Sequence, residues 1–283
     1  MPASAKIPVH QQKTTAVGGL DITHFHNQEE YTDLPEEHRD EYYILAVVIK
    51  GSGKMKCDMG TISIQSQSIF LMKPYQVHSA DSTGHDADAY FMSIAPFLVP
   101  EFCRDIFENT TVEGQCIKLL PADMNGIIKM AEMLYNSFVA DNIFKTEITT
   151  NLLNALIINA ASHFLISGQK NAHNKTQSFR ITQKFKELVR GHSFLHTASF
   201  FAERLHITTS HLNDCVKVTT GLSVTQFLQQ TMLLEAKRNL YYTNDDVKKI
   251  AFDLGFEDHT YFSRLFKKLT NETPLGFRKR FRE

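Results

Sequence analysis

The densest group of side chains able to bind another molecule lies between residues 259 and 269. Apolar residues recur there at the spacing of one buried helix face; they are Phe262, Leu265, Phe266 and Leu269. The opposite face then carries groups that donate hydrogen bonds to base edges or neutralise phosphates in a DNA groove. These groups are His259, Thr260, Ser263, Arg264, Lys267 and Lys268. The alternative is an ordinary helical hairpin with a solvated basic face.

A shorter helical run ends just before this one. Ile250 and Leu254 share one helix face, and Gly255 suits the left-handed conformation that ends a helix. Asp258 suits the first position of the next helix, where its carboxylate caps the backbone. Two helices joined by so short a turn, the second with an outward polar face, predict a helix-turn-helix.

The same pattern occurs a second time upstream, as TASFFAERLHITTSHLNDCVKVTTG. The two copies are offset by 49 residues before the turn and by 50 residues after it, so the two turns differ in length by one residue. Thr197 and Thr208 are the expected N-caps of the first copy. A generic hairpin does not explain an internal repeat of this kind. The contact candidates in the first copy are Ser210, His211, Asn213 and Lys217.

The connecting segment SVTQFLQQTMLLEAKRNLYY lacks Gly and Pro, and Ser223 can cap it. As a helix it spans roughly 28 Å, close to the ~34 Å between successive major grooves on one side of DNA. Residues 180–282 resemble the DNA-binding domain of the AraC family of bacterial transcription regulators. The resemblance rests on three segments: ERLHITTSHLNDCVKVTTGLS, EAKRNL and AFDLGFEDHTYFSRLFKKLTNETPLGFRKRF.

This resemblance implies a seven-helix domain with two helix-turn-helix units, double-stranded promoter DNA and RNA polymerase as partners, and more often activation than repression. It places His259, Thr260 and Arg264 at base-contacting positions, with the neighbouring Ser and Lys side chains on phosphates. The first copy departs from the family pattern twice. Asp214 stands where the second copy has Arg264, and His206 replaces the usual turn glycine. Base reading is therefore expected more from the second copy.

The charge is divided between the two halves of the chain. Residues 179–283 hold 17 Lys and Arg against 11 Asp and Glu, and residues 1–178 hold 13 against 20. The basic half supplies attraction for phosphates. The four cysteines are too far apart in sequence for a metal clip or redox pair, which fits a reducing compartment. With no apolar run long enough for a membrane, the expected location is cytoplasmic.

The N-terminal half predicts many short strands separated by turns, as in a β-barrel. The order DEYYILAVVIKGSG, a strand, then LMKPYQVHS resembles a cupin barrel, the usual sensing domain in one branch of the same family. The resemblance implies a pocket for an effector of unknown chemistry, with polar side chains near its mouth. These are His38, Tyr42, Tyr43 and His78.

No metal, cofactor or catalytic residue is assigned from the sequence. His38 and His78 could stand for two cupin ligands, but the glutamate position is Ile44, and two histidines do not make a typical zinc or iron site. His24 and His26 form a His-x-His pair at the wrong spacing. The chain is therefore expected not to be an enzyme. A metal-dependent cupin enzyme with a DNA-binding tail, and a regulator without any ligand, are the alternatives.

The overall expectation is an α+β multidomain protein. Residues 1–120 form a cupin-like sensing barrel, and residues 121–165 form two amphipathic helices. By resemblance these helices are the homodimerisation element; the alternative is that both faces are buried within one chain. Residues 166–178 are polar and predict a linker. Residues 179–283 form the double helix-turn-helix domain.

Overall fold

The computed structural model describes residues 8–11, 18–28, 37–58, 60–83, 86–170, 177–190 and 194–282. The chain divides into two compact units, Met1–Asn171 and Ala172–Glu283. The first combines β-sheets with helices, and the second is helical. Each unit is described by itself below.

Two antiparallel sheets form the body of the first unit. The five-stranded sheet has the order β10-β7-β4-β9-β2, and the three-stranded sheet has the order β6-β5-β8. A short parallel pair joins β1 (Val9–His10) to β3 (Arg39–Asp40). The other strands are β2 (Leu20–Gln28), β4 (Tyr43–Lys50), β5 (Gly53–Cys57), β6 (Gly60–Ile64), β7 (Ser68–Met72), β8 (His78–Thr83), β9 (Ala87–Ile94) and β10 (Cys116–Lys118).

Strand β4 shows how the sequence assigns the two faces of the larger sheet. Successive side chains of a strand point to opposite faces. Ala46 and Val48 lie in the apolar core between the sheets, together with Ile62 of β6 and Phe70 of β7. Tyr43, Leu45 and Val47 must then point to the other face, and all three are buried as well. A strand buried on both faces explains the near-continuous apolar run YILAVVIK.

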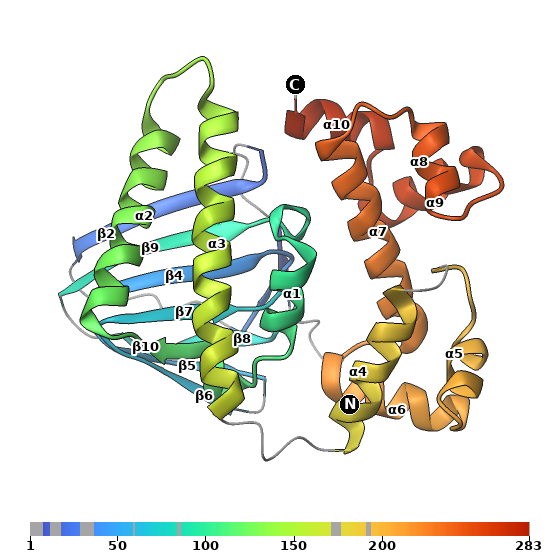
Figure 1. The fold of residues 1–283 in the computed structure, drawn as a ribbon, viewed down its shortest axis with the longest axis horizontal. Helices are drawn as coiled ribbons and strands as arrows, with labels where there is room; N and C mark the ends of the chain where they lie inside the picture. The colour runs from blue at the N-terminus through green and yellow to red at the C-terminus, as the bar shows by residue number, and fades with distance from the viewer. Residues whose placement is uncertain are drawn as a thin grey trace, which may run out of the picture. The chain divides into compact units, whose positions relative to one another are not determined.

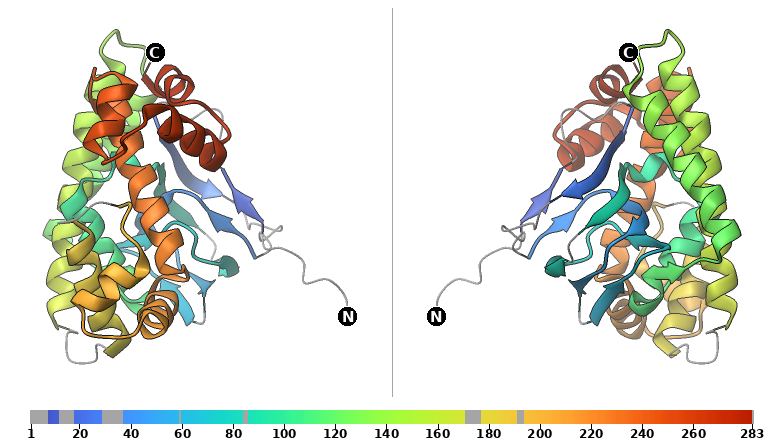
Figure 2. Two further views of the ribbon diagram at one scale, coloured as in Figure 1. Left: turned by 90° about the vertical axis from the view of Figure 1, so that its right-hand side faces the viewer. Right: turned by 90° about the vertical axis from the view of Figure 1, so that its left-hand side faces the viewer.

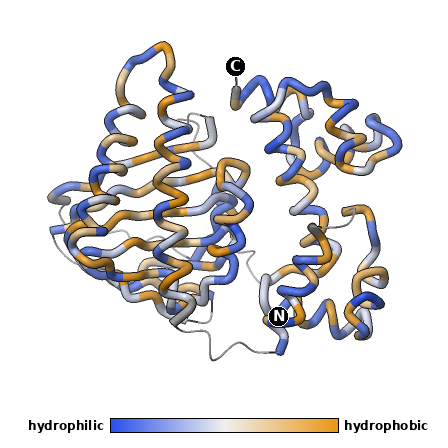
Figure 3. Tube along the Cα trace, in the orientation of Figure 1, coloured by the Kyte–Doolittle hydropathy of each residue, from blue (hydrophilic) through white to orange (hydrophobic). Residues whose placement is uncertain are grey.

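Helices cover that second face of the five-stranded sheet (Figure 1). They are α1 (Glu101–Glu108), α2 (Pro121–Val139) and α3 (Lys145–Lys170). In α2 the predicted apolar stripe is buried at Ile127, Ala131 and Leu134. The side views show α2 and α3 on one side of the sheet and the smaller sheet on the other (Figure 2). Apolar residues recur along the strands and along α3 (Figure 3).

Helix α3 is longer than the sequence predicted. It continues to Lys170, so residues 166–170, assigned to a linker on composition, are helical. The next described element, α4, begins at Gln177. Composition alone missed the extension because Gln and Lys suit a helix as well as a linker. The rest of the predicted linker, 171–176, lies outside the described residues.

Seven helices form the described part of the second unit, as the resemblance implied. They are α4 (Gln177–Arg190), α5 (Ala198–Arg204), α6 (Thr209–Thr220), α7 (Val224–Tyr242), α8 (Val247–Asp253), α9 (His259–Thr270) and α10 (Pro274–Arg282). Helix α7 contributes to both halves of this unit. Val224 and Leu228, near its start, lie in the core formed with α4, α5 and α6. Near its end, the carbonyl of Leu240 accepts a hydrogen bond from Arg278 Nε of α10 at 3.1 Å.

Candidate nucleic-acid interface and barrel site

The turn of the second helix-turn-helix has the predicted geometry. Gly255 follows Leu254, the C-cap of α8, and adopts φ +90°. The N–H of Phe256 donates to the carbonyl of Ala251 at 2.9 Å. This is the bonding pattern of a glycine-terminated helix. The Asp258 carboxylate then accepts from the Thr260 N–H at 2.7 Å, and this hydrogen bond holds the pKa of Asp258 below its ordinary value. The turn and the cap together fix where α9 begins.

The apolar stripe of α9 is narrower than the sequence predicted. Phe262 and Phe266 are fully buried and Leu265 is half-buried, but Leu269 is 37% exposed. On the other face, Ser263 is half-buried and the remaining predicted contact residues are exposed. These are His259, Thr260, Arg264, Lys267 and Lys268. Their spacing along one helix places them on a single accessible surface.

Tyr261 joins this surface and was missed from the sequence. Its side chain is 54% exposed at the start of α9. At the offset of 50 it corresponds to His211, which was a candidate in the first copy. The repeat therefore contained the signal that identifies Tyr261. A ring at this place can contact a thymine methyl group or a sugar.

The first helix-turn-helix repeats the backbone of the second. His206 adopts φ +55° at the place of Gly255, and the Ile207 N–H donates to the carbonyl of Ala202 at 3.1 Å. Histidine is one of the few residues besides glycine that is enriched in this conformation. The ends of the second helices also match, with Gly221 and Asn271 both left-handed. The replacement of the turn glycine therefore preserves the fold of the first copy.

The structure brings three of the four candidates of the first copy to an exposed surface. Ser210, His211 and Lys217 are exposed on α6, as is Asp214. Asn213 is half-buried and makes hydrogen bonds within the chain, and its contact with a base stays a prediction. Its Oδ1 accepts from the Val224 N–H at 3.1 Å, and its Nδ2 donates to the carbonyl of Thr209 at 3.0 Å. The amide oxygen thus contacts the start of α7, and the amide nitrogen contacts the start of α6.

The substitution Asn213→Ala should affect stability and leave base preference unchanged. Losing the acceptor for a backbone N–H at the start of α7 is expected to cost about 1 kcal/mol of unfolding free energy. Urea unfolding measures the loss, with the exposed Ser210→Ala as the matched control. A changed selected DNA sequence at unchanged stability would show that Asn213 contacts a base.

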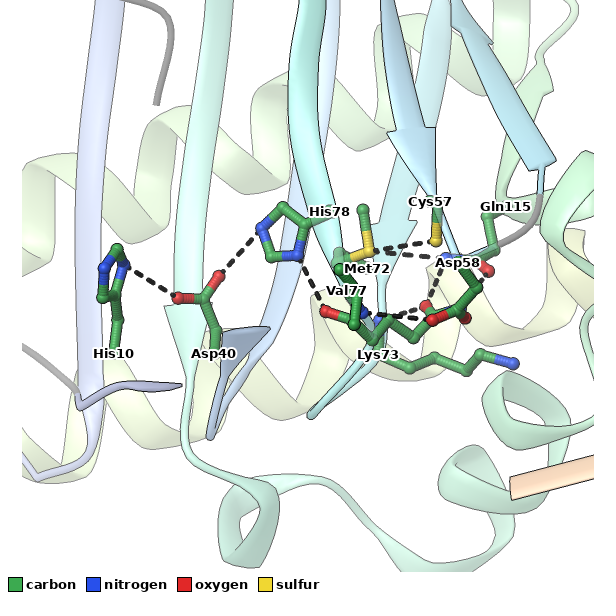
Figure 4. Close-up of polar contacts among 10 residues, drawn as sticks. His10, Asp40, Cys57, Asp58, Met72, Lys73, Val77, His78 and Gln115 are labelled. Atoms are coloured by element: carbon green, nitrogen blue, oxygen red, sulfur yellow. Dashed lines mark hydrogen bonds and ion pairs between the residues drawn. The ribbon is translucent and has the colours of Figure 1, made fainter. Parts of the chain in front are cut away.

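A buried cluster of ionisable side chains lies at one end of the barrel of the first unit (Figure 4). Asp40 of β3 and His78 of β8 are only 2% and 4% exposed, and Asp40 Oδ2 lies 3.2 Å from His78 Nε2. His38 pairs with His78 through two backbone hydrogen bonds of 3.0 and 2.9 Å, and their rings are 4.3 Å apart. His10 of β1 also stacks on His38, with the ring centroids 4.4 Å apart. The structure thus brings together the two predicted pocket histidines.

The partners of His78 fix its protonation. Its Nδ1 faces the carbonyl of Gln76 at 3.0 Å, and a carbonyl only accepts, so Nδ1 carries a proton. Burial alone would lower the pKa of His78, but the hydrogen bond to Asp40 outweighs it and the pKa is raised. Burial would likewise raise the pKa of Asp40, yet the hydrogen bonds from His78 and Tyr42 hold it below its ordinary value. Both shifts favour the charged forms, an imidazolium beside a carboxylate.

The two predicted pocket tyrosines lie on different sides of the sheet. Burial raises the pKa of Tyr42 far above its ordinary value, with its hydrogen bond to Asp40 adding to the shift, so its hydroxyl belongs to the cluster. Tyr43 points to the helix-covered face, where its hydroxyl donates to Glu108 Oε1 of α1 at 2.7 Å. Tyr42 lies just before β4, and Tyr43 is the first residue of that strand. The prediction that Tyr43 lines the barrel is therefore wrong.

A second polar group lies near the first, where Gln76 of the β7–β8 loop meets Gln115 (Figure 4). The side-chain amides of Gln76 and Gln115 exchange hydrogen bonds of 3.1 and 2.8 Å. Gln115 also donates to the carbonyl of Leu71 at 2.7 Å. The Cys57 thiol donates to Met72 Sδ, and burial raises its pKa to about 12. These side chains satisfy one another's hydrogen bonds, so the interior is ordered by contacts within the chain.

A two-sheet barrel followed by a duplicated helix-turn-helix defines the chain as a DNA-binding regulator by class. The model of an AraC-like ligand binding domain matches residues 19–138, and that of a helix-turn-helix domain matches residues 201–280. The chain belongs to the AraC family of transcription regulators. Within the described residues, no helix is both long and apolar enough to cross a membrane.

Several relatives match over most of this chain. The uncharacterized HTH-type transcriptional regulator YfiF of Bacillus subtilis is 25% identical over 256 residues, which cover 87% of this chain and 79% of YfiF. The HTH-type transcriptional activator Btr of the same organism is 25% identical over 251 residues, covering 88% of this chain. The chain spans about half the length of Btr, 46%. The HTH-type transcriptional activator RhaS of Yersinia pestis is 21% identical, covering 87% of this chain and 89% of RhaS.

Solved structures of similar proteins include ToxT from Vibrio cholerae O395. It aligns over 94% of this chain and 95% of its own, with 15% identity and a TM-score of 0.43.

Proposed function

We propose that this regulator is a sequence-specific transcription activator that works as a cytoplasmic homodimer and changes promoter occupancy when a small molecule binds its N-terminal unit. The observation that carries the DNA-binding part is the exposed polar face of α9, repeated in a modified form on α6. Activation is supported by two relatives, Btr and RhaS, which are both named transcriptional activators. An activator of this kind also contacts RNA polymerase.

The exposed residues of α9 divide into two expected roles. Arg264 can reach the O6 and N7 acceptors of one guanine, and His259 and Thr260 lie one turn earlier towards the helix start. Lys267 and Lys268 in the last turn, with Ser263, fix the helix on the phosphates. In the first copy Ser210 and His211 take the base-reading role and Lys217 the phosphate role. Asp214 can accept from a cytosine amine but repels phosphate.

Selection of bound duplexes from a random DNA pool by the full-length chain, at near-physiological salt, tests this proposal. Two major-groove half-motifs about one helical turn apart support the double helix-turn-helix, and a doubled site supports the homodimer. A chain that enriches no sequence, with or without residues 1–171, would overturn the function proposed.

The substitution Arg264→Ala is expected to weaken binding to the selected site by about 1–3 kcal/mol and to relax one base position. Lys267→Ala is the matched control on the same helix. It should weaken all sequences alike and reduce the salt dependence of binding. Binding titrations of both variants on matched and mutated sites measure the difference. An equal loss on all sequences for Arg264→Ala would assign Arg264 to the phosphates.

Dimerisation is proposed for residues 121–165, extended by the observed length of α3. Residues 1–120 are then the sensing barrel and residues 179–283 the DNA-binding domain. Helices α2 and α3 bury one side against the sheet but leave several large apolar side chains exposed, which favours a partner helix. These side chains are Met133, Val139, Ile158, Leu165 and Ile166.

A regulator without a ligand is the second candidate. Two features favour it: the core between the sheets is apolar, and the buried amides of Gln76 and Gln115 hydrogen-bond to each other. The test is to add the small molecules on which the enzymes of the target operon act. A rise in the melting temperature of the protein would show that it binds an effector.

A further inference from the structure

Two histidines that the proposed function does not use lie on strand β2. His24 and His26 are two residues apart, so their side chains share one face of the sheet. Strand β2 pairs with β9 in a register that sets His24 opposite Tyr90 and His26 opposite Asp88. Asp88 therefore projects from the same face, between the two imidazoles. This is the face that carries α2, not the interior between the two sheets (Figure 1).

The geometry of the three side chains matches that of ligands around one metal ion. His24 Nε2 lies 3.0 Å from Asp88 Oδ1, and His26 Nδ1 lies 3.2 Å from Asp88 Oδ2. One ligand atom from each residue falls within 4.8 Å of the others. Zinc binds such atoms at about 2.0–2.2 Å in a tetrahedron, which sets neighbouring ligand atoms about 3.3 Å apart. The two separations between imidazole and carboxylate are already close to this value, and the remaining separation is within 4.8 Å.

The backbone around Asp88 is irregular on both sides. The β2–β9 register shifts between His26 and Gln28, and the β4–β9 register shifts between Val48 and Lys50, both next to Asp88. Bulges of this kind re-aim side chains and are frequent beside functional sites. Regular pairing would hold Asp88 in a uniform ladder. Here its direction is set by a local departure from that ladder.

The surroundings hold one histidine in place and leave the other accessible. The His24 ring stacks on Tyr90 with the centroids 4.1 Å apart, and Tyr135 of α2 meets it edge-on at 5.8 Å. His26 is 59% exposed. A cation can therefore enter from solvent onto a partly preorganised ligand set.

We propose that His24, His26 and Asp88 form a binding site for a divalent transition-metal ion, with Zn²⁺ as the ion its ligands suit. Two imidazoles favour Zn²⁺ over Mg²⁺ and Ca²⁺, which take oxygen ligands. Three protein ligands leave a fourth position for water or another donor. The site is separate from the barrel cluster and does not depend on the proposed DNA binding.

Zinc titration by calorimetry tests the site, using tag-free full-length protein first stripped with a chelator. One Zn²⁺ per chain is expected. His26→Ala and Asp88→Asn should each weaken binding at least about tenfold, since even second-shell losses cost about 10- to 100-fold. Because His26 is exposed, His26→Ala should keep the wild-type circular dichroism and melting temperature. A Co²⁺-loaded sample should also lose its visible absorption in both variants.

His10→Ala is the matched control, because His10, His38 and Asp40 form the other group of possible ligands among the described residues. It should bind zinc as the wild type does. Unchanged zinc affinity in His26→Ala and Asp88→Asn would overturn the proposal. So would loss of binding in His10→Ala alone, or failure of the wild type to bind one equivalent.

Discussion

Replacing Phe266 with alanine is expected to lower the unfolding free energy of the second unit by about 3–5 kcal/mol, the usual cost of truncating a buried phenylalanine. Phe266 is fully buried, and its ring lies 5.9 Å from that of Phe262 and 6.0 Å from that of Phe277. These rings hold α9 against α10. Loss of the contact should release α9 and abolish DNA binding although no contact residue has changed.

Hydrogen exchange followed by mass spectrometry measures this locally, through faster exchange of the α8–α9 amides. Leu269→Ala is the matched control, since Leu269 lies on the same helix and is 37% exposed, whereas Phe266 is fully buried. It should change exchange and DNA binding little. If both variants lost exchange protection and DNA binding to a similar extent, Leu269 would belong to the buried face of α9, as the sequence predicted.

The second large effect is expected at the barrel cluster. Asp40→Asn removes the carboxylate beside a buried imidazolium, which is expected to cost about 3 kcal/mol of unfolding free energy in the first unit. His10→Ala removes only an exposed partner, 3.7 Å from Asp40 Oδ1, and should cost less than about 1 kcal/mol. Thermal unfolding of the full chain measures the two costs, through the transition in which the first unit unfolds.

The same pair gives a definite pH dependence. The raised pKa of His78 means that its stabilisation is complete below the ordinary value of 6.5 and is lost as the pH rises through the folded pKa. The lowered pKa of Asp40 means that its stabilisation is complete above 3.8 and is lost as the pH falls through the folded pKa. The unfolding free energy of the wild type should therefore exceed that of Asp40→Asn most between pH 3.8 and 6.5. A difference that grows above neutral pH would contradict the charged pair.

Local chemistry explains what could be read from the sequence in the helical unit. Caps act within a few residues, so Thr197, Thr208, Ser223 and Asp258 were identifiable, and each accepts the predicted backbone hydrogen bond. The turn conformation at Gly255 was identifiable for the same reason. Asn213 was not, because its partner, the Val224 N–H, belongs to the next helix. A polar residue on an outward helical face can be recruited by a neighbouring element, and only packing decides that.

The sheet unit shows a different limit. The strands around residues 43–94 could be expected from alternation and turns, but the register between them could not. Tyr43 was assigned to the pocket from the cupin resemblance, and the sequence of β4 could not correct this. The strand is apolar on both faces, so its pattern does not say which face points to the helices. His24 and His26 were visible as a pair, whereas Asp88 is 64 residues from His24 and joins them only through the β2–β9 register. Clusters formed across strands therefore need the topology.

Helix α7 has a consequence for the geometry of the DNA site. No loop interrupts it between the core of the first helix-turn-helix and the contact of Leu240 with α10. Each residue of an α-helix adds about 1.5 Å and about 100° of rotation. The helical phase of α9 relative to α6 is therefore set by the number of residues in α7. B-DNA repeats every ~10.5 base pairs, so the length of α7 sets the spacing of the two half-motifs. A residue inserted in α7 would rotate α9 relative to α6, and the two helices would no longer face successive major grooves together.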